Sequence, residues 1–261
     1  MLISITIPVY NDAEGLKVSL NSLIKQTYTN WEAIIVDDGS ITNVEHIVKE
    51  FKDDRLKFYR LEKNMGRPIA RQKTFKHIQG QYIGFLDAGD TYTIDFLSNI
   101  IRVLKVSNIL GVSQSMTVNY KNISYLSNYQ DECIDIASTK YNHISFASTV
   151  FKSEVCKDYK FDPTLRFSQD RHFLDFISVN FKGEICLINS HSYNYNQGDK
   201  MKVSTLFKKY YFSAKRLFNE RKYIKATRTL MKMIVFPLIQ IVFGYEVILN
   251  LRYEKQVNKS L

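Results

Sequence analysis

Residues 3–40 read ISITIPVYNDAEGLKVSLNSLIKQTYTNWEAIIVDDGS, and the spacing of apolar residues in this stretch decides the fold. Residues 4–9 and 32–38 are short runs of the kind that forms buried strands. Between them, Leu16, Leu20 and Leu23 recur at helical spacing. A strand, an amphipathic helix and a second strand in succession predict a parallel α/β unit.

The same alternation continues along the chain. We expect a helix over 43–51, a strand over 56–61, a helix over 68–79 and a strand over 81–87. Continuous apolar strands indicate a sheet that is covered by helices on both faces. The expected fold class is therefore α/β, with a mostly parallel sheet flanked by helices.

Acidic residues follow three of the four predicted strands. Residues 10–12 (YND), 37–40 (DDGS) and 87–90 (DAGD) all fall at the carboxyl ends of strands, where open α/β sheets bind ligands. Clustered carboxylates repel one another unless a cation or a donor-rich ligand lies among them. Because Mg²⁺ takes oxygen ligands and bridges phosphates, the pattern predicts a site for a nucleoside diphosphate with a divalent metal, Mg²⁺ or Mn²⁺.

Several other classes of protein lose support from the sequence. It has no GxxxxGK[ST] loop, and no GxGxxG follows the first strand, which argues against P-loop and dinucleotide-binding proteins. Cys133, Cys156 and Cys186 are widely spaced, so we expect reduced, buried thiols and neither a disulfide framework nor a zinc site. The first residues, MLISITIPVY, do not resemble a signal peptide, which favours the cytoplasm.

The order of several motifs resembles glycosyltransferase family two. The similarity starts in residues 3–40, continues in NMGRPIARQKTFKHIQGQYIGFLDAGD (64–90), and reappears in FASTVFKSEV (146–155) and FDPTLRFSQDRHFLDF (161–176). It covers about residues 2–198. The resemblance implies a GT-A fold, with a nucleotide-sugar-binding half (1–90) and an acceptor-binding half (91–200) inside one domain (1–200). It also implies inverting transfer, in which an acceptor hydroxyl attacks the anomeric carbon opposite the departing nucleoside diphosphate.

The resemblance also implies roles for individual residues. Asp170 matches the catalytic base, and Asp87 matches the first acid of the metal motif, with Asp90 as the nearby substitute for the second. The matches to nucleotide-sugar-binding positions are Pro8, Val9, Tyr10, Asp38, Gly66, Arg71 and Asp87. Elementary chemistry agrees, because a carboxylate can accept from a uracil imide, a guanidinium binds phosphate and a positioned Asp can take a hydroxyl proton.

Two departures from the family pattern leave alternatives open. The usual Asp-x-Asp-Asp reads Asp87-Ala88-Gly89-Asp90 here, so Asp90 could cap a helix starting near Thr93 while Asp87 contacts ribose without a metal. Gln169 stands where the family has Glu, and Asp170 could cap the helix near 170–180. Asp37 and Asp38 could form a turn, and Arg71 could be a solvated surface residue.

The excess positive charge of the chain lies in residues 201–261, the basic tail. Residues 200–261 hold 14 Lys/Arg against 3 Asp/Glu, whereas residues 1–199 hold 22 against 23. An amphipathic stripe runs from Val203 to Phe218, and the apolar run Ile234–Leu249 is too short and interrupted to predict a membrane span. We expect residues 203–259 to contact an anionic membrane surface, with packing on the catalytic body or a homodimer partner as the alternative.

Three functions compete at this point. The leading prediction is an inverting glycosyltransferase that uses a nucleoside-diphosphate sugar, most simply a UDP-sugar, on a glycan or lipid-linked acceptor in bacterial surface polysaccharide synthesis. It would be cytoplasmic and peripheral on the inner face of the membrane. The second is a catalytically silent nucleotide-sugar-binding or scaffolding protein of the same fold. Nucleic-acid binding is disfavoured, because the basic residues accompany an apolar stripe and no recognised reading motif.

Overall fold

The computed structural model describes residues 1–105, 109–120, 123–127, 129–138, 144–165, 169–197, 210–211, 214, 223–243 and 254–256. Strands and helices alternate through its first part, and the four predicted strands are confirmed to within two residues at each end. The elements are β1 (Ile3–Val9), α1 (Ala13–Ile24), β2 (Trp31–Asp37), α2 (Glu45–Glu50), β3 (Leu56–Arg60), α3 (Arg67–Phe75) and β4 (Tyr82–Phe85).

The second part of the chain is richer in antiparallel strands. Its elements are β5 (Thr91–Tyr92), α4 (Phe96–Leu104), β6 (Gly111–Tyr120), β7 (Ile123–Leu126), β8 (Glu132–Asp135), β9 (Thr149–Lys152), a 3₁₀ turn (Ser153–Cys156), α5 (Gln169–Asn180), β10 (Glu184–Gln197), α7 (Tyr223–Phe243) and β11 (Glu254–Gln256).

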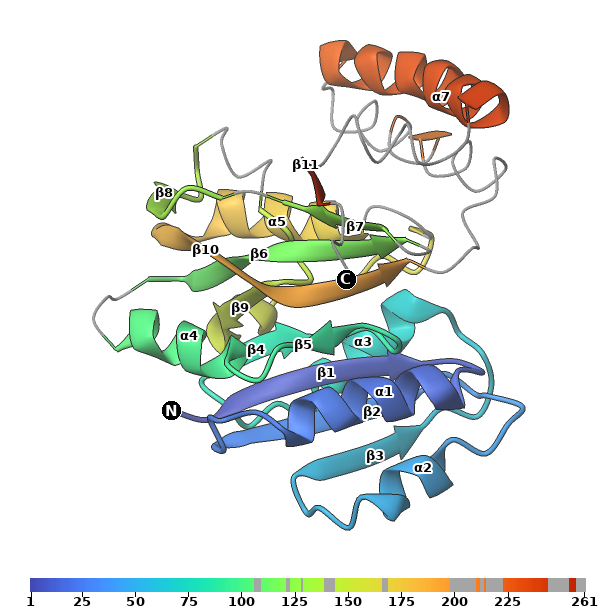
Figure 1. Ribbon diagram of the computed structural model, residues 1–261, viewed down its shortest axis with the longest axis vertical. Helices are drawn as coiled ribbons and strands as arrows, with labels where there is room; N and C mark the ends of the chain where they lie inside the picture. The colour runs from blue at the N-terminus through green and yellow to red at the C-terminus, as the bar shows by residue number, and fades with distance from the viewer. Residues whose placement is uncertain are drawn as a thin grey trace.

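All of the described strands belong to one mixed sheet (Figure 1). Its main path runs β11-β7-β6-β9-β4-β1-β2-β3, with β1 to β4 parallel and β9 antiparallel to both β4 and β6. The long strand β10 pairs with β5, β6 and β8. The halves predicted at 1–90 and 91–200 therefore share a single sheet, and β9 joins them directly.

The parallel strands bury different side chains on their two faces. Ile3, Ile5 and Ile7 of β1 pack with α1 in the largest apolar cluster. On the opposite face, Ile34 and Val36 of β2 pack with Ala70 of α3. Because both faces are covered, these strands read as nearly continuous apolar runs, and only their ends are free to carry polar side chains.

The prediction of three free cysteine thiols was wrong for two of them. Cys133 of β8 and Cys186 of β10 lie directly opposite each other in an antiparallel pair and form a disulfide, where the spacing led us to expect free thiols. Their separation of 53 residues gives no local signal, since only the register of two distant strands brings them together. Cys156 is the free, buried thiol that was expected, and burial raises its pKa.

Within the basic tail, the structure describes chiefly α7. This helix lies at one end of the molecule, beyond β7 and β11 and at the opposite end from β3 (Figure 1). None of the described helices is both long and apolar enough to cross a bilayer. Most of the amphipathic stripe predicted from Val203 to Phe218 lies outside the described residues.

Candidate active site

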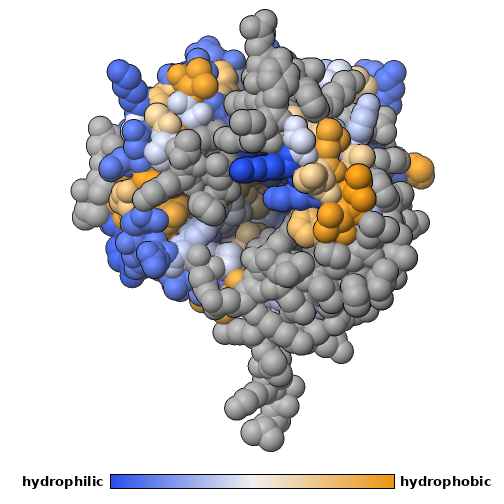
Figure 2. Space-filling model, turned by 90° about the horizontal axis from the view of Figure 1, so that it is seen from above, coloured by the Kyte–Doolittle hydropathy of each residue, from blue (hydrophilic) through white to orange (hydrophobic). Residues whose placement is uncertain are grey.

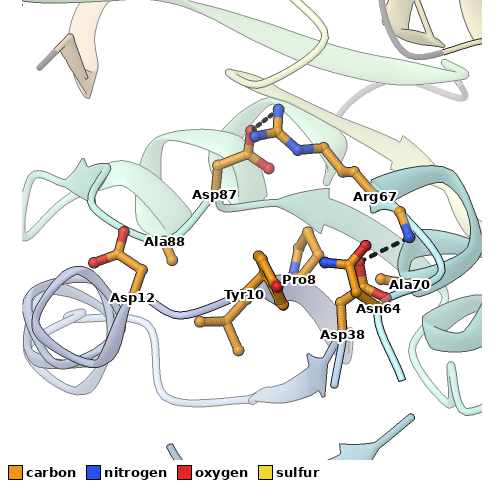
Figure 3. A pocket seen from close by; sticks show the side chains of 11 residues that line it. Pro8, Tyr10, Asp12, Asp38, Asn64, Arg67, Ala70, Asp87 and Ala88 are labelled. Atoms are coloured by element: carbon orange, nitrogen blue, oxygen red, sulfur yellow. Dashed lines mark hydrogen bonds and ion pairs between the residues drawn. The ribbon is translucent and has the colours of Figure 1, made fainter. Parts of the chain in front are cut away.

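The carboxyl ends of β1, β2 and β4 surround a pocket of about 310 Å³. Six of the residues predicted to bind the nucleotide sugar line it, namely Pro8, Val9, Tyr10, Asp38, Gly66 and Asp87. In Figure 3, Asp87 and Arg67 lie along one side of the pocket, and Asp38 and Asn64 lie along the other. The parallel arrangement of the strands brings these side chains together from far apart in the sequence.

Asp37 and Asp38 take different roles in the turn that follows β2. Asp37 is fully buried, and its carboxylate accepts from the Ser40 N–H at 2.9 Å, so the turn interpretation holds for this residue. Gly39 has a φ of 69° and backs onto the Lys63 backbone so closely that a Cβ would clash. This tight turn aims the next carboxylate, that of Asp38, at the pocket.

Asp38 is held by the loop that leads into α3. Its two carboxylate oxygens accept from the backbone N–H groups of Met65 at 2.8 Å and Gly66 at 2.9 Å. Burial raises the pKa of Asp38 despite these two bonds. Each oxygen keeps a second acceptor position, so the carboxylate is fixed in orientation and can still accept from a ligand.

Asp87 is the charged centre of the pocket. One oxygen accepts from Arg71 at 2.8 Å, and the other lies 3.4 Å from Arg67. Burial alone would raise the pKa of Asp87, but the positive charges of Arg71 and Arg67 outweigh it and hold the pKa at about 2. The carboxylate is therefore ionised, and two guanidinium groups surround it.

The two arginines differ sharply in exposure. The Arg71 side chain is 7% exposed, lies over the Phe146 ring and places one nitrogen 3.4 Å from the Gln169 amide oxygen, so the solvated-surface alternative is wrong for it. Arg67 is 61% exposed and lines the pocket, which Arg71 does not. Arg71 thus binds Asp87 from the buried side, while the guanidinium of Arg67 is the one that a ligand in the pocket can contact.

Asp90 is directed toward β10 and does not line the pocket. Its carboxylate accepts from the Tyr193 hydroxyl at 2.6 Å and from the Asn196 N–H at 2.9 Å. Burial and then repulsion by Asp87 raise the pKa of Asp90 to about 7. The helix-cap alternative is wrong, because α4 begins at Phe96 and Asp90 makes no contact of that kind.

The turn between the two acids contains a glycine in a backbone conformation that other residues rarely adopt. Gly89 has a φ of 97°, which favours glycine, and its carbonyl accepts from the Asn196 side chain at 2.7 Å. The Ser19 hydroxyl of α1 donates to the Asp90 carbonyl at 2.7 Å. Residues from α1 and β10 therefore hold the 87–90 turn from two directions.

Asp170, the predicted base, lies in the first turn of α5 and is exposed. Its neighbour Gln169 is buried and contacts Arg71, which in turn binds Asp87. The structure thus places Asp170 next to the chain of contacts that leads to the pocket, although Asp170 does not line the pocket itself.

Five further residues line the pocket. Asp12 and Ala88 belong to the strand-end segments 10–12 and 87–90 that the sequence placed at the ligand site, whereas Asn64, Arg67 and Ala70 were missed. Arg67 carried a usable signal, because it follows Gly66 in the first turn of α3, where the helix dipole disfavours a cation. A cation kept in that position suggests an anionic partner. Asp12 also caps α1 by accepting from the Gly15 N–H.

The predicted metal ligands, Asp87 and Asp90, both have protein partners in this arrangement. All four carboxylate oxygens of Asp87 and Asp90 already have partners, on Arg71, Arg67, Tyr193 and Asn196. Among the described residues, no group of three or more His, Cys, Asp or Glu side chains could hold a metal ion. A metal bound by both acids would share these oxygens with the partners that they already have, through their remaining lone pairs.

Comparison with known proteins agrees with this geometry. The family model described as Glycosyl transferase family 2 matches residues 4–162. The UDP-Glc:alpha-D-GlcNAc-diphosphoundecaprenol beta-1,3-glucosyltransferase WfgD of Escherichia coli is 37% identical over 108 residues, which are 41% of this chain. The match spans 43% of the length of that relative.

Solved structures confirm the predicted GT-A fold class. S. aureus TarS 1-349 in complex with UDP-GlcNAc superposes with a TM-score of 0.70 at 18% identity, covering 95% of this chain and 76% of TarS. The mannosyltransferase PcManGT from Pyrobaculum calidifontis, in complex with GDP-Man and Mn²⁺, gives 0.64 at 13% identity, covering 95% and 78%. At these identities the likeness concerns the fold alone.

Proposed function

The chain belongs to glycosyl transferase family 2, and on that premise we propose that it is an inverting transferase acting on a nucleoside-diphosphate sugar. The observation that carries the proposal is the pocket of about 310 Å³ at the strand ends. Asp38 lies on one side of this pocket, and the Asp87–Arg67 pair lies on the other. One side offers a fixed acceptor for a base, and the other offers a guanidinium for phosphate.

The nucleoside is proposed to bind at the end of β1 and β2. Tyr10 is 45% exposed at the pocket and offers a ring face to a base. Asp38 is held by Met65 and Gly66, so its free acceptor positions can pair with an imide N–H, which favours uracil. UDP-Glc in the name of the E. coli relative supports the same choice of donor class.

The diphosphate is proposed to lie beside the Arg67 side chain, at the N-terminal end of α3. Arg67 offers forked N–H donors, and the positive end of the dipole of α3 favours an anion. Arg71 keeps Asp87 ionised and fixed from the buried side. Asp87 is then available to accept from hydroxyl groups of the ribose or the donor sugar at the pocket wall.

Asp170 is proposed to act as the base. An acceptor hydroxyl would lose its proton to the Asp170 carboxylate while its oxygen bonds to the anomeric carbon. The bond between that carbon and the diphosphate oxygen breaks, and the nucleoside diphosphate leaves with the electron pair. A glycan or lipid-linked acceptor in surface polysaccharide synthesis is proposed from the diphosphoundecaprenol in the E. coli relative's name. Such an acceptor would put the protein on the inner face of the membrane.

The divalent metal predicted from the sequence stays a prediction. Asp87 and Asp90 are the residues that would hold it, and no step above passes through a metal. The decisive titration measures UDP affinity with Mn²⁺ and with chelator, in the wild type, Asp87→Asn and Asp90→Asn. Metal ligation by both acids requires Mn²⁺-enhanced binding that both variants lose.

The competing proposal is a silent nucleotide-sugar-binding protein, and the contacts of Asp90 with β10 favour it. Release of UDP from a panel of UDP-sugars, with and without lipid-linked acceptors, separates the two. Turnover that Asp170→Asn abolishes supports the enzyme. Thermal stabilisation by UDP-sugars without any turnover across the panel would support the silent protein instead.

A further inference from the structure

One face of α7 carries exposed apolar side chains. Met231, Ile234 and Val235 are 66%, 57% and 49% exposed, and they are spaced three and four residues apart, so they share one face of the helix. Figure 2 views the molecule from the end where α7 lies and shows hydrophobic residues gathered in one area there. We call Met231, Ile234 and Val235, together with Arg228 and Lys232, the outer face of α7.

The opposite side of α7 packs on the body of the protein. Met233 and Phe236 contact a cluster formed by Val118 of β6, Tyr125 of β7 and Tyr210. The Phe236 and Tyr210 rings lie 5.6 Å apart. This packing fixes the rotation of α7 about its own axis, so the exposure of the outer face follows from how the helix is seated.

The charges on the outer face are all positive. Arg228 and Lys232 are exposed and lie within one turn of Met231 and Val235 at helical spacing. No Asp or Glu occurs anywhere in α7, and residues 200–261 as a whole hold 14 Lys/Arg against 3 Asp/Glu. Apolar side chains flanked by cations are the pattern of helices that lie in the headgroup region of anionic bilayers.

We propose that the outer face of α7 binds the surface of an anionic lipid bilayer. Met231, Ile234 and Val235 enter the boundary between headgroups and acyl chains, while Arg228 and Lys232 pair with lipid phosphates. A second copy of the chain fits this face less well. In a two-fold dimer the same cations would meet each other, and like charges at an interface oppose association. The proposal concerns a surface away from the pocket and does not depend on the activity proposed above.

Vesicle flotation of the full chain tests the proposal. Wild type should float with vesicles of phosphatidylglycerol and phosphatidylcholine and should stay behind with phosphatidylcholine alone. The triple variant Met231→Ser, Ile234→Ser, Val235→Ser should lower the partition coefficient roughly 100-fold, since each side chain loses part of its apolar transfer. The double variant Arg228→Gln, Lys232→Gln should lower it roughly 30-fold and weaken its salt dependence.

Matched controls come from elsewhere on the surface. Ile41→Ser, Ile94→Ser, Val179→Ser changes three apolar residues that are 89%, 59% and 82% exposed, and Lys157→Gln, Lys160→Gln removes two exposed cations. Both controls should bind vesicles as the wild type does. The proposal is overturned if wild type ignores phosphatidylglycerol, or if the controls lose as much binding as the α7 variants. A concentration-dependent dimer that the triple variant abolishes, without any vesicle binding, would assign the face to a second copy.

Discussion

Replacing Tyr193 by Phe tests whether β10 holds the turn that carries Asp87. The substitution removes one hydroxyl, which donates to the buried Asp90 carboxylate at 2.6 Å. The ring itself is retained, with its packing against Tyr92 at 5.6 Å and Phe96 at 6.4 Å. The change in unfolding free energy therefore reports the hydrogen bond and little else.

The size of the expected change in unfolding free energy depends on the charge of the acceptor, Asp90. A hydrogen bond to a charged group is worth about 1.5–3 kcal/mol, and an unpaired buried acceptor adds its own desolvation penalty. We expect Tyr193→Phe to lower the unfolding free energy by about 2–3 kcal/mol in urea titrations above about pH 8, where Asp90, with a pKa of about 7, is ionised. In an Asp90→Asn background the loss should shrink by about 1–2 kcal/mol, because the neutral amide depends less on the hydroxyl.

Tyr92→Phe is the matched control. Its buried hydroxyl donates to the Phe85 carbonyl at 3.1 Å, so we expect a loss of about 1 kcal/mol that is nearly additive with Asp90→Asn. A loss below about 0.5 kcal/mol in Tyr193→Phe, or equal coupling of both tyrosines to Asp90, would refute the assigned role of Tyr193.

Three further predictions concern the rest of the chain. Burial alone would raise the pKa of Glu32, but hydrogen bonds from Lys57, Ser4 and the Gln79 N–H outweigh it and lower the pKa. The ionised Glu32 therefore stabilises the fold above the unfolded pKa of about 4.3, and this stabilisation is lost as the pH falls through the lower folded pKa. Glu32→Gln should flatten the acid side of the plot of unfolding free energy against pH, measured by urea unfolding. An unchanged slope of that plot would contradict this. Asp170→Asn should keep UDP affinity by calorimetry while lowering transfer roughly 10²–10⁴-fold, and near-normal turnover would rule it out as the base. Unfolded protein purified without reductant should show one titratable thiol, from Cys156, because Cys133 and Cys186 are paired; three thiols would show that the pair is reduced.

The fold and one wall of the site were accessible from the sequence because they depend on local patterns. Apolar runs marked β1, β2, β3 and β4, and parallel strands necessarily bring Asp38 and Asp87 to the same edge of the sheet. The exposure of Arg67 and the burial of Arg71 were not predictable in the same way. They depend on which side of α3 faces Gln169, which lies 98 residues away from Arg71.

The hydrogen-bond partners of Asp90 could not be predicted from the sequence for a related reason. Its partners Tyr193 and Asn196 lie in β10, a strand whose neighbours β5, β6 and β8 run in different directions. The register of such a strand is set by tertiary packing, and the same register places Cys186 opposite Cys133. The unforeseen partners of Asp90 and the wrong expectation that Cys133 and Cys186 are free thiols therefore both concern contacts of β10.

That strand also sets the order of events during synthesis. Asn196 lies 106 residues after Asp90. At about 5–20 residues per second, a ribosome needs roughly 5–20 s to extend the chain from Asp90 to Asn196. Until β9 emerges, β4 presents an unpaired edge, and until β10 emerges, the turn at 87–90 lacks half of its contacts. The nascent chain thus passes through a stage in which most of the pocket residues exist but the pocket is unfinished. A pause in translation between residues 90 and 149, before β9 is made, would prolong that stage and leave the β4 edge open to pairing with other chains.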